Sequence, residues 1–117
     1  MIPRIKKLWV KALRSGKYKQ GRNALCHAGR YCCLGVLCDI AVKQGAMSRR
    51  KAFRENCQLN TDMLNWTQCR IGDPVLKVPH HIRDSVGRRC AALNDGHPGL
   101  TFKQIARLIE RTPAKDI

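Results

Sequence analysis

The chain has 117 residues and a formal net charge of +15, because 23 lysines and arginines stand against only 8 aspartates and glutamates. With 44% hydrophobic residues and no apolar run near the ~20 residues of a membrane span, we expect one cytoplasmic globular domain that is neither a disordered basic tail nor engaged with a membrane. Small domains stay soluble with a net charge of roughly 2 to 8, so this excess points to a polyanionic or acidic partner.

Residues 1–16 predict a basic amphipathic helix. Ile5, Trp9 and Leu13 recur at helical spacing and form an apolar stripe for the core. No acidic residue precedes Asp39. The side opposite the stripe carries a basic row made of Arg4, Lys7, Lys11 and Arg14.

Residues 17–32 predict an irregular β-hairpin with turns near 21–23 and at Ala28-Gly29. Residues 33–45 then predict a buried, cysteine-rich helix that is apolar nearly all round. Gly35 lies inside this helix at a cost of about 1 kcal/mol relative to alanine, which a close helix crossing explains.

Residues 46–58 carry a second basic cluster, on a loop or a short helix. Residues 59–117 predict a helical part that begins with a short helix capped by Asn60 or Thr61. In this part, apolar spacing predicts one helix over 78–93.

The last helix has the clearest start signal, an N-cap at Thr101 with Gln104 completing a capping box. The seven residues 94–100 before it exceed the usual turn of a helix-turn-helix, which favours an ordinary helical hairpin. The whole predicts one small α+β domain over 1–117, predominantly α-helical, with one irregular hairpin and four to five helices.

Several short strings in the chain occur together in one known group of proteins. The strings are Trp9, ALRSG at 12–16, Tyr18, QG at 20–21, CCLGVLCD at 32–39, LND at 93–95, TF at 101–102 and IA at 105–106. With them the chain resembles a group of small bacteriophage and prophage proteins, most of them of unassigned function, strongly over residues 9–39 and more weakly over 93–110. The resemblance implies a phage gene product in a bacterial cytoplasm, and no catalytic mechanism or cofactor comes with it.

The seven cysteines are expected to be buried thiols, because an odd number without a secretory signal argues against disulfides. For zinc, only Cys33 and Cys38 have the spacing of a ligand pair, and a second pair is missing near Cys26-His27 or elsewhere. We therefore predict neither a metal nor a cofactor.

A cysteine hydrolase is the enzymatic alternative, since Cys32 or Cys33 near a helix start would have a lowered thiol pKa. Local sequence signatures of papain-like and NlpC-like hydrolases are absent, so we expect a protein without catalytic activity. The residues available as base and orienting partner are His80, His81, Asp84, Asn94 and Asp95.

We predict a phage-type accessory protein that binds nucleic acid or a host nucleoprotein complex, with interference in host defence or gene expression as the role that the resemblance suggests. Six aromatic residues favour backbone and shape recognition over base stacking. The alternative is a protein-binding inhibitor of an acidic host target. The predicted contact residues are Arg4, Lys7, Lys11, Arg14, Lys17, Lys19, Arg22, Arg30, Arg49, Arg50, Lys51 and Arg54.

Overall fold

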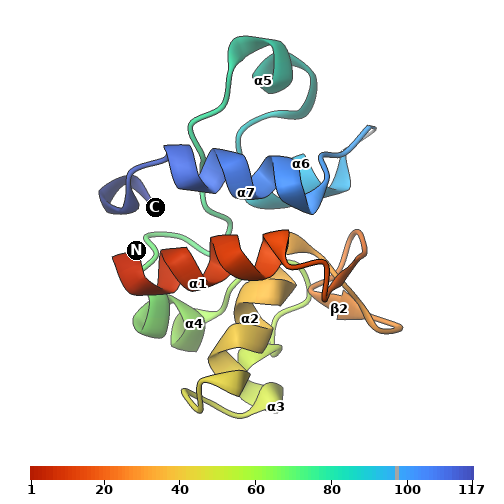
Figure 1. The fold of residues 1–117 in the computed structure, drawn as a ribbon. Helices are drawn as coiled ribbons and strands as arrows, with labels where there is room; N and C mark the ends of the chain where they lie inside the picture. Colours follow the sequence, from red (N-terminus) through yellow and green to blue (C-terminus); the bar gives the residue numbers. More distant parts are fainter. Residues whose placement is uncertain (97) are drawn as a thin grey trace.

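Helix α2 forms the centre of the computed structural model, which describes residues 1–96 and 98–117, and for residues 84–86 the backbone alone. Helices α1 and α7 lie side by side near the start of α2, and α3 packs near its end (Figure 1). The helices of the described residues are α1 (Pro3–Arg14), α2 (Cys33–Lys43), α3 (Arg49–Ala52), α4 (Thr61–Thr67), α5 (His80–Val86), α6 (Cys90–Asp95), α7 (Phe102–Arg111) and the 3-10 turn η1 (Ala114–Asp116).

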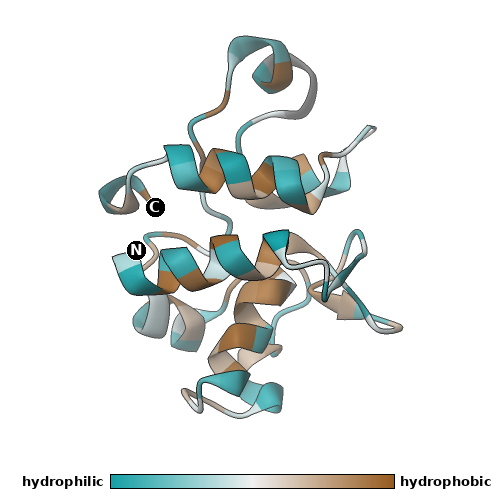
Figure 2. Ribbon diagram, viewed as in Figure 1, coloured by the Kyte–Doolittle hydropathy of each residue, from teal (hydrophilic) through white to brown (hydrophobic). Residues whose placement is uncertain are grey.

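Helix α2 is the buried cysteine-rich helix that the sequence predicts. Every residue from 33 to 41 is buried, and Figure 2 shows the helix in brown along most of its length. Cys32 is the N-cap, its sulfur accepting from the Gly35 N–H at 3.4 Å. The only buried charge on α2 is Asp39, so its burial needs partners outside the helix.

Gly35 is required by a close backbone approach. A Cβ on Gly35 would lie 1.7 Å from the Leu25 carbonyl oxygen. The neighbour is thus the backbone of the bend at Leu25, just before β2, and the expected helix crossing is wrong. Leu25 is held there because its N–H donates to the Asn56 carbonyl at 2.7 Å and its carbonyl accepts from the Cys32 N–H at 3.3 Å.

Three two-residue strands form a small sheet in the order β1-β3-β2. Strands β2 and β3 are the predicted hairpin, and Ala28 and Gly29 at its turn have φ of 50° and 76°, the left-handed values that tight hairpin turns need. Strand β1 adds to β3 in parallel, which the sequence did not predict. The strands are β1 (Lys19–Gln20), β2 (Cys26–His27) and β3 (Arg30–Tyr31).

The single helix predicted over 78–93 is wrong, because the chain breaks at Gly87. Gly87 has φ of 95° and ends α5, and Arg89 then pairs with Val75 in an antiparallel bridge before α6 begins. The apolar spacing belongs to two helices: Cys90 on α6 is fully buried, whereas Ile82 on α5 is half-buried. The side chain of Val86 lies outside the described residues.

Helices α1, α4 and α7 have the buried faces and the N-caps that the sequence predicts. Ile5, Trp9 and Leu13 of α1 are buried, and Asn60 caps α4 by accepting from the Met63 N–H at 2.9 Å. The capping box of Thr101 and Gln104 is formed at the start of α7.

The α+β class is therefore confirmed. The described residues contain seven α-helices where four to five were expected, because 78–93 holds two and the basic cluster of 46–58 contains α3. No described helix is long and apolar enough to cross a membrane.

Substituting Gly35 by alanine tests the backbone contact beneath α2. The methyl group cannot fit beside the Leu25 carbonyl, so we expect a loss of about 3 kcal/mol or more in the free energy of unfolding, measured by urea denaturation. Gly16→Ala is the control, because Gly16 has φ of 75° and open space around it. This control should lose only about 1–2 kcal/mol, from the left-handed backbone alone. Equal losses in the two variants would contradict the proposed contact.

Candidate functional site

The predicted basic row lies on the outer side of α1. Arg4, Lys7 and Lys11 are exposed, and none of them forms an ion pair with a described residue. Arg14 differs, because its guanidinium makes two hydrogen bonds of 2.9 and 3.0 Å to the Glu110 carboxylate on α7. These bonds hold the pKa of Glu110 below its usual range, so the pair stays ionised. Three of the four cations therefore remain available to a partner.

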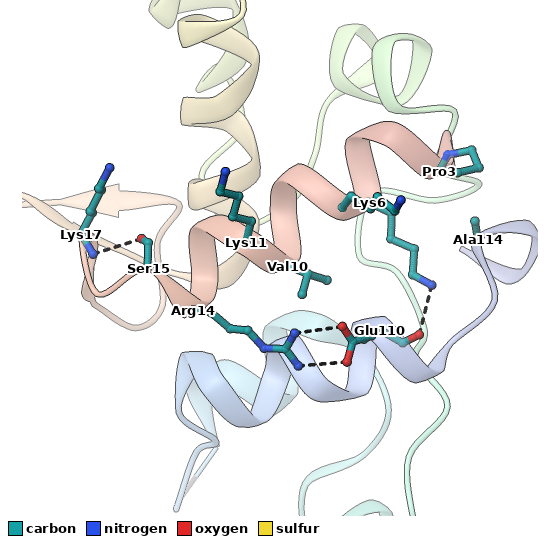
Figure 3. A pocket seen from close by; sticks show the side chains of 10 residues that line it. Pro3, Lys6, Val10, Lys11, Arg14, Ser15, Lys17, Glu110 and Ala114 are labelled. Atoms are coloured by element: carbon teal, nitrogen blue, oxygen red, sulfur yellow. Dashed lines mark hydrogen bonds and ion pairs between the residues drawn. The ribbon is translucent and has the colours of Figure 1, made fainter.

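A groove of about 770 Å³ runs along the α7 side of this row. Val10 lies between the two helices, and the Arg14–Glu110 pair crosses from one helix to the other (Figure 3). Lys6 also bridges the helices, since its Nζ donates to the Glu110 carbonyl at 3.3 Å. Lys11 and Lys17 line the groove as well. The groove thus has an apolar base and cationic walls.

A second groove, of about 260 Å³, lies on the opposite side of the row, between α1 and the end of α2. Lys11 and Lys17 line this groove too, together with Lys43 from α2. The cations of α1 therefore continue onto α2. Lys43 was missed as a site residue because the sequence marked it only as the end of a helix.

Asp39 links the end of α2 to α3. Its side chain is only 10% exposed, and it accepts from the Tyr18 hydroxyl at 2.5 Å. Its two oxygens also pair with Lys43 at 3.2 Å and with Arg49 at 3.3 Å. Burial, with the hydrogen bond to Asp39, raises the pKa of Tyr18. One buried carboxylate thus places two cations from different helices next to each other.

Three aromatic rings gather beside this carboxylate, although they are far apart in the sequence. The centroid of Tyr31 lies 5.2 Å from that of Tyr18 and 6.3 Å from that of Phe53, both edge-to-face. The Arg49 guanidinium lies 4.4 Å from the Phe53 centroid and donates to the Tyr31 hydroxyl at 3.3 Å. We call Tyr18, Tyr31, Asp39, Lys43, Arg49 and Phe53 the Asp39 cluster.

The second basic cluster surrounds a concavity of about 880 Å³ at α3. Ser48 begins the helix by accepting from the Lys51 N–H at 3.2 Å, which fixes the direction of the following residues. Arg50 and Lys51 are exposed and have no acidic partner among the described residues, whereas Arg54 pairs with Asp62 at 3.6 Å.

These surfaces form one continuous strip, because each shares a residue or an ion pair with the next. Lys11 and Lys17 belong to both grooves, Lys43 and Arg49 share Asp39, and Arg49 lines the concavity at α3. We call this strip the cationic tract: Lys7, Lys11, Lys17, Lys43, Arg49, Arg50 and Lys51.

The other predicted contact residues lie elsewhere. Lys19 is exposed on β1. Arg22 donates to the Gly96 carbonyl at 3.0 Å and Arg30 to the Gln20 carbonyl at 3.4 Å, so both guanidinium groups help to hold the small sheet in place.

The cysteines at the start of α2 are buried, as predicted, and they lack the lowered thiol pKa that the cysteine-hydrolase alternative requires. Burial raises the pKa of Cys32 to about 12, and a hydrogen bond with Cys90 together with burial raises the pKa of Cys33 well above its usual value. Burial therefore outweighs the favourable helix end, and both thiols stay protonated at neutral pH. Among the described residues no group of three or more His, Cys, Asp and Glu side chains is placed to hold a metal.

The two histidines suggested as a base for a thiol nucleophile lie away from the start of α2, whereas Asn94 and Asp95 lie near it. His80 and His81 are exposed on α5, which projects from the body beyond α7 (Figure 1). The side chain of Asp84 lies outside the described residues. Asn94 is fully buried and acts in the scaffold: its Oδ1 accepts from Gln20 and from the Cys33 N–H, and its Nδ2 donates to the Gly21 carbonyl.

The chain belongs to the family described as Domain of unknown function (DUF8296), whose model matches residues 1–113. No curated protein and no solved structure matches the chain. The matched region includes the whole cationic tract and the Asp39 cluster.

The buried thiols predict a loss of stability at alkaline pH. The pKa of Cys32 and that of Cys38 are raised from 9.0 to about 12 in the folded state, so the unfolded chain releases these protons first. Their contribution is complete well below pH 9 and is lost as the pH rises from there toward 12. The free energy of unfolding measured by urea denaturation should therefore fall as the pH rises through 9 toward 12, and less steeply in Cys38→Ala.

Thiol labelling provides the control for this prediction. Cys57 is exposed and Cys26 half-buried, so a thiol reagent should modify these two in the folded protein and the other five only on unfolding. Rapid labelling of Cys32 or Cys38 at neutral pH would contradict their burial.

Asp39→Asn tests the junction between α2 and α3. Removing the charge weakens the bonds to Tyr18, Lys43 and Arg49 at a nearly buried position, so we expect a loss of about 2 kcal/mol in the free energy of unfolding. Glu110→Gln is the matched control, because it breaks an exposed pair and should change stability less. An equal or larger loss in Glu110→Gln would show that Asp39 does not hold the junction together.

Proposed function

We propose that this protein binds nucleic acid, or a nucleoprotein complex, by contacting phosphates along the cationic tract. The observation that carries the proposal is the continuity of the tract from α1 across the end of α2 to α3. Most of its cations face solvent without an acidic partner among the described residues. A row of separate positive charges on a convex helix and a neighbouring concavity suits the regularly spaced charges of a phosphate backbone.

The tract combines two kinds of cation with different tasks. Lys7, Lys11 and Lys17 are flexible point charges, which neutralise phosphates without demanding a fixed geometry. Arg49 is held in place by Asp39, Tyr31 and Phe53, so its guanidinium is pre-oriented for one defined contact. The phosphate contacts of the tract are therefore expected to be independent of sequence and to make binding steeply dependent on salt.

The biological setting is proposed from the sequence resemblance. A phage-type accessory protein acting in the cytoplasm of a bacterial host, without catalysis of its own, agrees with a surface built for binding. Engagement of a host defence or gene-expression complex that contains nucleic acid fits both the setting and the charge.

A second candidate function, inhibition of an acidic protein target, is favoured by the groove between α1 and α7. Val10 and Pro3 give this groove an apolar lining, and Lys6, Lys7 and Lys11 surround it. An acidic amphipathic segment would match both features. Partners captured from bacterial lysate that survive nuclease treatment would favour this candidate over nucleic-acid binding.

Neutralising the row on α1 tests the main proposal. Binding to a labelled duplex and to a folded RNA is measured by fluorescence anisotropy across a salt series. The double variant Lys7→Gln/Lys11→Gln should bind more weakly, and the slope of log affinity against log salt should fall by about 1 for each lysine that contacts a phosphate.

The matched control is Lys103→Gln/Lys115→Gln, which removes the same charge from exposed positions outside the tract. Equal losses of affinity in the two double variants would show that binding depends on the net charge of the protein and not on the tract. A wild-type affinity that does not change with salt would reject phosphate binding.

A further inference from the structure

We propose that the cavity formed by Arg49, Phe53 and Glu55 binds an unpaired guanine base of a single-stranded nucleic acid. This inference rests on the proposed function and names the feature that the tract would select. The cavity measures about 260 Å³, and its remaining lining comes from Leu25, Cys26 and Asn56. No metal or catalytic group is required, because the base is recognised by stacking and by hydrogen bonds.

The position of the cavity suits a nucleotide. Arg49 and Phe53 line both this cavity and the larger basic concavity at α3. A base in the smaller space would therefore have its phosphates next to Arg50 and Lys51. The two spaces together provide the apolar and the cationic halves of a nucleotide site.

A stacking surface is already assembled at the shared wall. The Arg49 guanidinium lies 4.4 Å from the Phe53 ring centroid, and the Phe53 ring contacts Tyr31 at its edge. Asp39 also holds Arg49, with an Asp39 oxygen 3.3 Å from the guanidinium. Unpaired bases stack on aromatic rings and on guanidinium planes of this kind, whereas paired bases inside a duplex do not reach such a cavity.

Glu55 determines which base is preferred. Its carboxylate is exposed within a strongly basic segment, and it pairs with no cation among the described residues. Such a carboxylate repels phosphates, so it hinders polyanion binding unless it accepts hydrogen bonds from the ligand. The Watson–Crick edge of guanine offers two adjacent donors, N1–H and the amino group, to a carboxylate. The edges of adenine, cytosine and uracil each place a donor beside an acceptor, which a carboxylate cannot match.

The test measures fluorescence anisotropy with labelled single-stranded 12-mers. Each pair of 12-mers has the same sequence except that one member carries a single guanine at its centre, and each pair is made as RNA and as DNA. The guanine-containing oligonucleotide should bind about 5- to 100-fold more tightly, the range that one stacked and hydrogen-bonded base supplies. The RNA and DNA sets distinguish the two sources of the base.

Substitutions at Glu55 and Phe53 separate the contributions of the cavity. Glu55→Gln should remove most of the preference for guanine, whereas Asp116→Asn removes an equal charge outside the cavity and should keep the preference. Phe53→Leu should weaken binding of the single strand more than binding of a duplex, and Phe53→Tyr, which keeps the ring, should restore it. The melting temperature of each variant confirms that it is folded.

The outcomes are distinct from those for the proposed function. If all oligonucleotides and the duplex bind with the same affinity and a steep salt dependence, phosphate binding stands and the guanine site is rejected. If the duplex binds and no single-stranded oligonucleotide does, phosphate binding stands and the guanine site is rejected; if neither binds, both proposals fail. A guanine preference that Glu55→Gln leaves unchanged would also overturn the assignment of Glu55.

Discussion

The architecture depends on the hydrogen bonds at the first turn of α2. The Asn94 Oδ1 accepts from the Cys33 N–H at 3.2 Å, and the Trp9 indole donates to the Cys33 carbonyl at 2.8 Å. Two other helices thus hold the same residue of the central helix, through side chains that are fully buried. A buried N–H or carbonyl without these partners would cost free energy, so the packing of α1 and α6 on α2 is strongly specified.

The same network positions the surface. Asn94 also binds Gln20 and Gly21, which places the segment before β2 and leaves Tyr18 facing Asp39. Trp9 points into the core, so the opposite side of α1 must face solvent with its lysines. The orientation of the cationic tract is therefore a consequence of bonds formed in the interior, although none of the tract residues takes part in them.

Electrostatics divides the cations into two groups. A net charge of +15 opposes a compact fold through self-repulsion. Asp39 and Glu110 relieve part of this repulsion where helices meet, since each is bonded to a cation of another helix. Five cations of the tract are exposed and form no ion pair with a described residue: Lys7, Lys11, Lys17, Arg50 and Lys51. They supply the field by which we propose that the protein attracts phosphates.

The sequence predicted those elements whose structure depends on residues close together in the chain. The apolar stripe of α1, the uninterrupted burial of α2 and the capping box at Thr101 each depend on residues only a few positions apart. The break at Gly87 escaped prediction because its cause is a pairing between Val75 and Arg89.

The Asp39 cluster escaped prediction for a similar reason. Tyr18, Tyr31 and Phe53 meet only after the hairpin and α3 have folded against α2. The partner of Gly35 was likewise a distant backbone segment. A local signal could show that a glycine was needed there, but it could not show what that glycine faces.

The segment that carries α5, residues 77–87, leaves and rejoins the rest of the fold at one pair of hydrogen-bonded segments, which we call the base. The Leu76 N–H donates to the Arg88 carbonyl at 2.8 Å, and the Cys90 N–H donates to the Pro74 carbonyl at 2.9 Å. Because these two chain segments are hydrogen-bonded to each other, the length of chain between them has little influence on the stability of the fold. Doubling the length of a flexible loop lowers the free energy of unfolding by only about 0.6 kcal/mol. A change in the length of this segment should therefore cost little, provided that it keeps the packing of Val78 and Ile82 against the core and the bond from the Lys77 N–H to the Thr112 hydroxyl at 2.8 Å. For protein engineering, a foreign peptide is best placed between Ile82 and the base.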